Sequence, residues 1–94
     1  MFDSAKAGVM AMVRTKPTEV EVHVGWLDGR PRSVVLEDQR VPVLSISQIR
    51  DELAAYPADR GPRRIFDVRT PQARVRLSFE RRRRRWFMEA LEAA

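Results

Sequence analysis

Strict alternation of apolar and polar residues in two segments is the feature that most constrains how this chain folds. Over residues 19–26 the apolar members are Val20, Val22, Val24 and Trp26. Over residues 73–80 they are Ala73, Val75, Leu77 and Phe79. A period of two places successive side chains on opposite faces of a β-strand, so each segment predicts a strand with one buried face.

Three more strands are predicted from turn signals and apolar runs. Asp28-Gly29 favours a hairpin turn, because glycine tolerates positive φ, and its partner strand should cover residues 32–36. Residues 41–46 and 64–69 are further apolar segments next to turn-forming residues. Pro42 lacks an N–H, which indicates that its strand lies at a sheet edge or carries a bulge.

Two segments admit a helix. Residues 48–56 predict one short amphipathic helix, because apolar residues recur there at helical spacing: Ile49, Leu53 and Tyr56. Residues 80–92 are rich in helix-forming residues, but the arginines at 81–84 also suit a hairpin turn that returns Arg85–Glu89 along residues 73–80. We favour the hairpin.

The elements predict one small domain, since 94 residues bury only a modest core. The expected class is mostly β: a small antiparallel SH3-like barrel or bent sheet of five to six strands with one short helix. The alternative is an α+β fold in which residues 80–92 form a C-terminal helix on the sheet. Residues 1–17 are expected to be flexible or weakly helical, and residues 18–92 to form the β-rich domain.

The composition argues against catalytic and metal-dependent chemistry. The chain has no cysteine, which excludes disulfides and thiolate ligands, and its one histidine is His23. His23 and Glu21 share a strand face, but we interpret both as solvent-facing residues. We therefore expect no catalytic residue, no metal site, no cofactor and no enzymatic activity. No segment approaches the roughly 18 apolar residues of a membrane span, so we expect a cytoplasmic protein without membrane contact.

Positive charge is concentrated in one stretch. Residues 60–85 hold 11 arginines and two acids, whereas the rest of the chain is slightly acidic. If residues 64–69 and 73–80 pair as a hairpin, these arginines should converge on one side or one end of the sheet. The candidate nucleic-acid-binding residues are Arg63, Arg64, Arg69, Arg74, Arg76, Arg81, Arg82, Arg83, Arg84 and Arg85.

Such a cluster favours a polyanionic partner. Guanidinium groups bind phosphate in bidentate geometry, and a polyanion relieves the repulsion between like charges. Trp86 and Phe87 adjoin the arginine run and could stack on an unpaired base, although a core position is expected for Trp86. The sequence predicts a non-catalytic accessory module, monomeric or homodimeric, that binds DNA or RNA mainly through phosphate contacts. The alternative is an adaptor that docks an acidic protein or self-associates through a strand edge.

The order of elements also resembles a small bacterial β-domain family of unassigned activity, whose members are linked to translesion-polymerase gene neighbourhoods. The similar features are Gly29-Arg30-Pro31, the segment Arg64–Arg69 and the later residues Leu77 and Trp86, within residues 19–91. The chain departs from the family at Val34–Leu36, where an aromatic residue is expected. The resemblance implies a β fold and a role in DNA transactions such as DNA repair.

Overall fold

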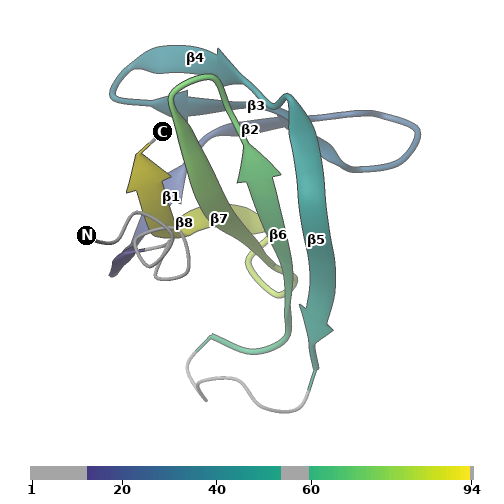
Figure 1. Cartoon of the computed structure of the whole chain (residues 1–94). Coiled ribbons are helices and arrows are strands. Elements are labelled where there is room, and N and C mark those ends of the chain that lie inside the picture. The colour runs from purple at the N-terminus through teal and green to yellow at the C-terminus, as the bar shows by residue number, and fades with distance from the viewer. Residues whose placement is uncertain (1–12, 54–59, 94) are drawn as a thin grey trace.

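The structure is a computed structural model that describes residues 13–53 and 60–93. In these residues the chain forms β1 (Val13–Val20), β2 (Val22–Val24), β3 (Pro31–Leu36), β4 (Gln39–Pro42), β5 (Ser45–Glu52), β6 (Arg63–Arg69), β7 (Ala73–Glu80) and β8 (Arg85–Ala93). The strands make two antiparallel sheets, ordered β1-β8-β7-β6-β5 and β2-β3-β4. In Figure 1 the strands of the smaller sheet run across the direction of β5, β6 and β7. The predicted mostly-β class is confirmed, but the described residues form eight strands rather than five to six.

The chain passes between the two sheets at two corners. At the first, Glu21 separates β1 from β2, and its carbonyl accepts a hydrogen bond from the Val35 N–H at 2.9 Å. At the second, the Leu44 N–H donates to the Arg69 carbonyl at 2.7 Å. The edge strands β1 and β5 of the larger sheet do not pair with each other. The predicted SH3-like barrel is therefore not closed, and the two sheets pack as an open sandwich.

The core lies between the sheets. The larger sheet contributes the alternating residues of β7, with Val75 and Leu77 fully buried, together with Phe66 from β6. The smaller sheet contributes Val34 and Val41. The prediction that the apolar members of residues 73–80 face the core is confirmed for Ala73, Val75 and Leu77. The inner face of the larger sheet is the face that packs against this core, and the outer face is the opposite one.

The short helix predicted over residues 48–56 is wrong where the structure describes it. Residues 45–52 form β5, which pairs with β6 from Ser45 opposite Arg69 to Glu52 opposite Arg63. A register shift between Ile46 and Gln48 inserts one extra residue, so Ile46 and Ile49 both oppose inner-face residues of β6. A β-bulge can thus place apolar residues three positions apart on one strand face. Tyr56 lies outside the described residues.

The C-terminal hairpin is confirmed, and the alternative helix over residues 80–92 does not form in the described residues. Arg85–Ala93 is β8, which lies between β1 and β7 and pairs with both. Its pairing with β7 shifts register between Arg76 and Leu77, which places Glu89 in a bulge. Helix propensity amounts to tenths of a kcal/mol per residue, so two flanking ladders of hydrogen bonds override it.

The segment predicted as one strand over residues 19–26 is divided. Its first residues end β1 in the larger sheet, whereas Val22–Val24 pair with β3 in the smaller one. Trp26 is not on the core face: it lies in the connection to β3 and is 89% exposed. The Gly25 N–H donates to the Arg30 carbonyl at 2.9 Å, which closes the hairpin before Trp26 can join the strand.

The boundary of the domain also differs from the expected one. Residues 13–17, predicted to be flexible or weakly helical, begin β1 and extend the larger sheet. Residues 1–12 lie outside the described residues. The hairpin from β2 to β3, the edge position of Pro42 and the strand over residues 64–69 agree with their predictions. The single strand predicted over residues 41–46 is wrong, because the chain changes sheet there between the end of β4 and the start of β5.

Candidate nucleic-acid interface

The turn between β7 and β8 presents five consecutive exposed arginines, Arg81–Arg85, which are called the turn arginines below. Its backbone is fixed by two hydrogen bonds. The Arg84 N–H donates to the Glu80 carbonyl at 2.7 Å, and the Arg81 N–H donates to the Pro62 carbonyl at 3.1 Å. Arg84 has a φ of 58°, the left-handed conformation that tight turns require. The guanidinium groups therefore project from a defined turn.

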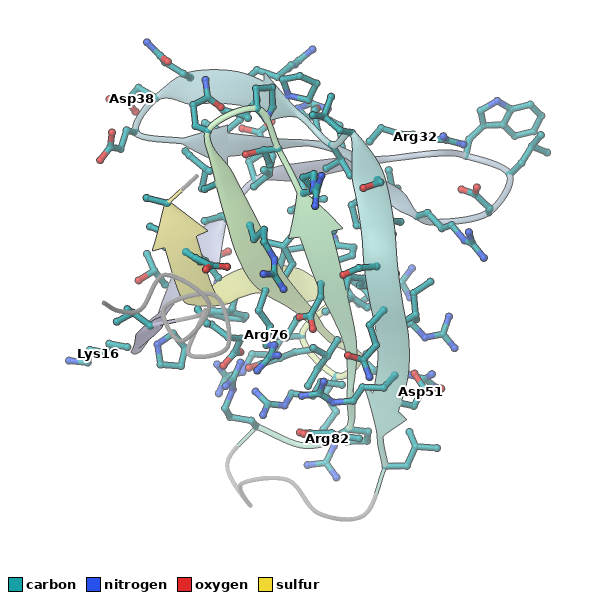
Figure 2. The ribbon with its side chains drawn as sticks, in the orientation of Figure 1. Lys16, Arg32, Asp38, Asp51, Arg76 and Arg82 are labelled. Atoms are coloured by element: carbon teal, nitrogen blue, oxygen red, sulfur yellow. The ribbon has the colours of Figure 1, made fainter. Side chains whose placement is uncertain are left out.

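Three of the predicted arginines lie on the outer face and pair with carboxylates there. The Arg76 guanidinium forms a bidentate contact with Asp67, at 2.7 and 3.1 Å, which raises the pKa of Arg76. Arg74 donates to Glu92 at 2.8 Å. Arg63 donates to two carboxylates, Glu52 at 2.8 Å and Glu89 at 3.0 Å. Figure 2 shows Arg76 over the middle of the larger sheet, apart from Arg82 at its end.

The acids near the turn arginines are mostly engaged elsewhere. Asp51 forms a bidentate pair with Arg64, at 2.7 and 3.2 Å, and that hydrogen bond lowers the pKa of Asp51. Arg81 lies 3.6 Å from the same carboxylate. Arg83 lies 3.7 Å from Glu80, whose other oxygen accepts from Arg60.

The remaining predicted arginines differ in whether a carboxylate lies near them. Arg85 approaches Glu19 at 3.4 Å. In the part of the chain that the structure describes, Arg69, Arg82 and Arg84 have no carboxylate oxygen within ion-pair distance. Arg69 lies opposite Arg74 across the β6–β7 ladder, at the other end of the strands from the turn. The ten arginines thus do not form one cluster: the outer-face group is largely neutralised, and the turn group keeps excess charge.

A buried ionic network on the outer face was not anticipated from the sequence. Arg60, three residues before β6, donates to Glu80, to Glu89 and to the Ser78 hydroxyl. Glu80 is 1% exposed, although alternation predicts a solvent-facing residue. The Arg60 guanidinium also lies over the Phe87 ring, 5.3 Å from its centroid. It therefore occupies a ring face that was expected to be available to a base. The sequence signal for this network is the presence of two carboxylates, Glu80 and Glu89, in a hairpin that is otherwise rich in arginine.

A hollow of about 440 Å³ opens beside the turn arginines, at one end of the space between the sheets. Its aromatic lining consists of Phe66, Phe79 and Trp86. Its basic lining consists of Arg64, Arg81 and Arg84, and Asp28 and Gly29 contribute from the β2–β3 connection. This hollow is called the basic hollow below.

A second hollow of about 610 Å³, called the acidic hollow below, is lined by residues of β1, of β3 and its turn to β4, and of the ends of β7 and β8 away from the turn arginines, and it carries the opposite charge. Its apolar lining includes Met88 and Leu91, and its acidic lining consists of Glu19, Glu21, Glu37 and Asp38. Figure 2 shows Asp38 and Arg82 at opposite ends of the molecule. The two hollows therefore differ in their linings: one is basic and aromatic, and the other is acidic and aliphatic.

His23 makes ordinary polar contacts. Its Nε2 lies 3.1 Å from a Glu21 carboxylate oxygen and 3.1 Å from the Arg40 guanidinium. Among the described residues no three His, Asp or Glu side chains are grouped as a metal site would require. No helix in the described ranges is long and apolar enough to cross a membrane.

The fold and this surface define a class: a small, open, two-sheet antiparallel β domain with an arginine-rich turn at one end. Comparison of the chain with protein-family models, with curated proteins and with solved structures gives no significant match to any of them.

Proposed function

We propose that this chain is a non-catalytic module that binds nucleic acid, mainly through contacts between the turn arginines and phosphate groups. The observation that carries the proposal is the charge balance at the turn. In the described residues Arg82 and Arg84 have no carboxylate within ion-pair distance, and Arg64 and Arg81 share the single carboxylate of Asp51. Asp51 and Glu80 are bound more closely by Arg64 and Arg60. The turn therefore keeps an excess of positive charge for a polyanion.

The geometry of the turn supports phosphate contact in particular. The five turn arginines are exposed and occupy consecutive positions. Each can offer a planar fork of N–H donors to phosphate oxygens, a geometry that lysine lacks. Binding would release counterions from the nucleic acid, and this release favours association whatever the sequence. The contact therefore requires no base-specific recognition.

Direct binding measurements with a salt titration test the proposal. Fluorescence anisotropy with a labelled oligonucleotide should give an affinity that falls steeply with salt, by about 0.7 to 0.9 logarithmic units per phosphate contact for each tenfold rise in salt. A variant carrying Arg82→Ala and Arg84→Asn should bind all sequences more weakly, with a shallower salt slope. Asparagine is chosen at position 84 because it tolerates positive φ.

A matched variant removes two positive charges far from the turn. Lys16→Ala with Arg40→Ala changes the net charge equally and should leave affinity nearly unchanged. The proposal fails if neither single-stranded nor duplex oligonucleotides bind in about 50 mM salt, the condition that favours phosphate contacts. It also fails if both variants weaken binding equally, because net charge alone would then explain the affinity. Binding of an acidic polypeptide in preference to any oligonucleotide would favour the adaptor instead.

A further inference from the structure

The basic hollow has the size and lining of a site for a planar ligand. Its volume of about 440 Å³ falls within the range of ~300–1,000 Å³ typical of small-molecule sites. Phe79 and Trp86 are half-buried, so each keeps part of its ring exposed while the rest packs in the protein. Phe66 is 4% exposed and lies beneath them.

The aromatic rings hold one another in fixed positions. The Trp86 centroid lies 5.1 Å from that of Phe79 and 5.3 Å from that of Phe66, at interplanar angles of 47° and 42°. Tilted contacts at these separations are favourable aromatic pairs. Trp86 pairs with Phe79 across the β7–β8 ladder, close to the turn arginines. An aromatic platform therefore lies beside a cationic turn.

The charge of the lining selects the ligand class. Arg81 and Arg84 contribute to the hollow from the turn, and Arg64 contributes from β6. The acidic hollow is also largely apolar, but its carboxylates would repel phosphate. An anionic ligand with a planar apolar group thus fits the basic hollow and not the acidic one.

We propose that the basic hollow receives an unpaired base of a single-stranded nucleic acid, while the turn arginines bind the phosphates that flank it. This inference rests on the proposed function and adds its substrate class. Bases in a duplex are stacked inside the helix, so a duplex reaches the turn arginines with its phosphates but cannot place a base against Trp86. Every base has a π-face, so the site selects strandedness rather than sequence.

Trp86 fluorescence provides the direct readout. The chain has two tryptophans, so Trp26→Phe leaves Trp86 as the only one. Three probes of about 12 nucleotides, within the usual span of such sites, are compared: oligothymidylate, an abasic strand with the same backbone, and a duplex. Oligothymidylate should quench Trp86 fluorescence and bind most tightly. The abasic strand and the duplex should bind through phosphates with little quenching.

A substitution on the platform tests the same contact independently. Phe79→Leu should weaken binding of oligothymidylate at least about fivefold, which is the lower end of the effect expected for losing one stacking partner. It should leave the affinity for the abasic strand unchanged. Leu91→Met makes a comparable apolar exchange in the acidic hollow and should have no effect. Thermal unfolding verifies that both variants fold. If Phe79→Leu does not fold, the comparison of the three probes on the parent chain still decides.

The outcomes separate this inference from the proposed function. If the abasic strand, oligothymidylate and duplex bind equally without quenching Trp86, the base site is wrong but phosphate binding stands. If no probe binds at all, the proposed function itself is wrong. Equal quenching by the duplex would also overturn the inference, because its bases are not free to enter the hollow.

Discussion

The guanidinium of Arg60 lies 2.6 Å from the carboxylate of Glu89, although the two residues are 29 positions apart in the chain. Arg60 is 13% exposed and Glu89 is 14% exposed, and Arg63 approaches the same carboxylate at 3.0 Å. The Ser78 hydroxyl donates to it as well. This contact joins the loop before β6 to the bulge in β8, across β7.

Replacing Glu89 should destabilise the domain. Glu89→Gln would remove the carboxylate that Arg60 and Arg63 share, but Glu80 and Glu52 remain as partners. The loss should therefore exceed about 1 kcal/mol and stay below the ~3–5 kcal/mol of a buried charge left unpaired. The free energy of unfolding in urea measures this loss. Glu92→Gln is the control, because the Arg74–Glu92 pair is more exposed and should be worth at most about 1 kcal/mol. Equal losses for the two variants would contradict a structural role for the buried network.

Stability should fall in acid, with Glu89 contributing. Burial by itself raises the pKa of this carboxyl, but hydrogen bonds from Arg60 and Ser78 and the charge of Arg63 outweigh burial and lower the pKa below its ordinary value of 4.5. A carboxyl group whose pKa is lowered by folding stabilises the protein at pH values above its unfolded-state pKa. This stabilisation is lost as the pH falls through its folded-state pKa. The urea midpoint should hold down to about pH 5 and then decline. In Glu89→Gln the decline should be shallower, and an unchanged pH dependence would refute this assignment.

Trp26 should contribute little to stability despite its size. Its side chain is 89% exposed on the β2–β3 connection, so Trp26→Ser should change the free energy of unfolding by no more than about 0.5 kcal/mol. Leu77→Ala provides the contrast, because Leu77 is fully buried and such truncations cost about 2–5 kcal/mol. Chemical denaturation compares the two. A large loss in Trp26→Ser would place this tryptophan in contact with the core.

Gly61 and Gly29 should differ in their tolerance of alanine. Both have positive φ, 74° and 68°, so alanine is strained at either position by about 1–2 kcal/mol. At Gly61 a Cβ would also lie 3.0 Å from the Arg82 Cδ, whereas at Gly29 it would meet nothing within 4 Å. Gly61→Ala should therefore lower the thermal midpoint more than Gly29→Ala. Equal losses at the two positions would show that the Arg82 side chain moves aside without cost.

The local pattern predicted most strands but not their assignment to sheets. Alternation over residues 73–80 and the turn residues Asp28-Gly29 specified a strand and a hairpin, because both signals act between near neighbours in the chain. The same reasoning placed a helix over residues 48–56, since apolar spacing alone does not separate a helical face from a bulged strand. The bulge in β5 becomes visible only when β6 supplies the register.

The candidate site was predicted in part. The turn arginines were found because they are consecutive, and a hairpin turn keeps consecutive residues together. Arg63, Arg74 and Arg76 were grouped with them because the predicted hairpin of residues 64–69 and 73–80 was expected to bring their charges together, but their carboxylate partners lie up to 26 residues away in the chain. The hollow between Trp86 and the β2–β3 connection brings together residues from both sheets, which no local spacing could indicate.

The sequence by itself determined the class of the fold, the strand over residues 73–80 and the concentration of arginine near residue 82, because these follow from composition and from periods of a few residues. Only the tertiary structure decided which of those charges remain uncompensated. Ion pairing acts over a few ångströms between residues that the sheets bring together, so the net charge of a segment does not give the charge of a surface.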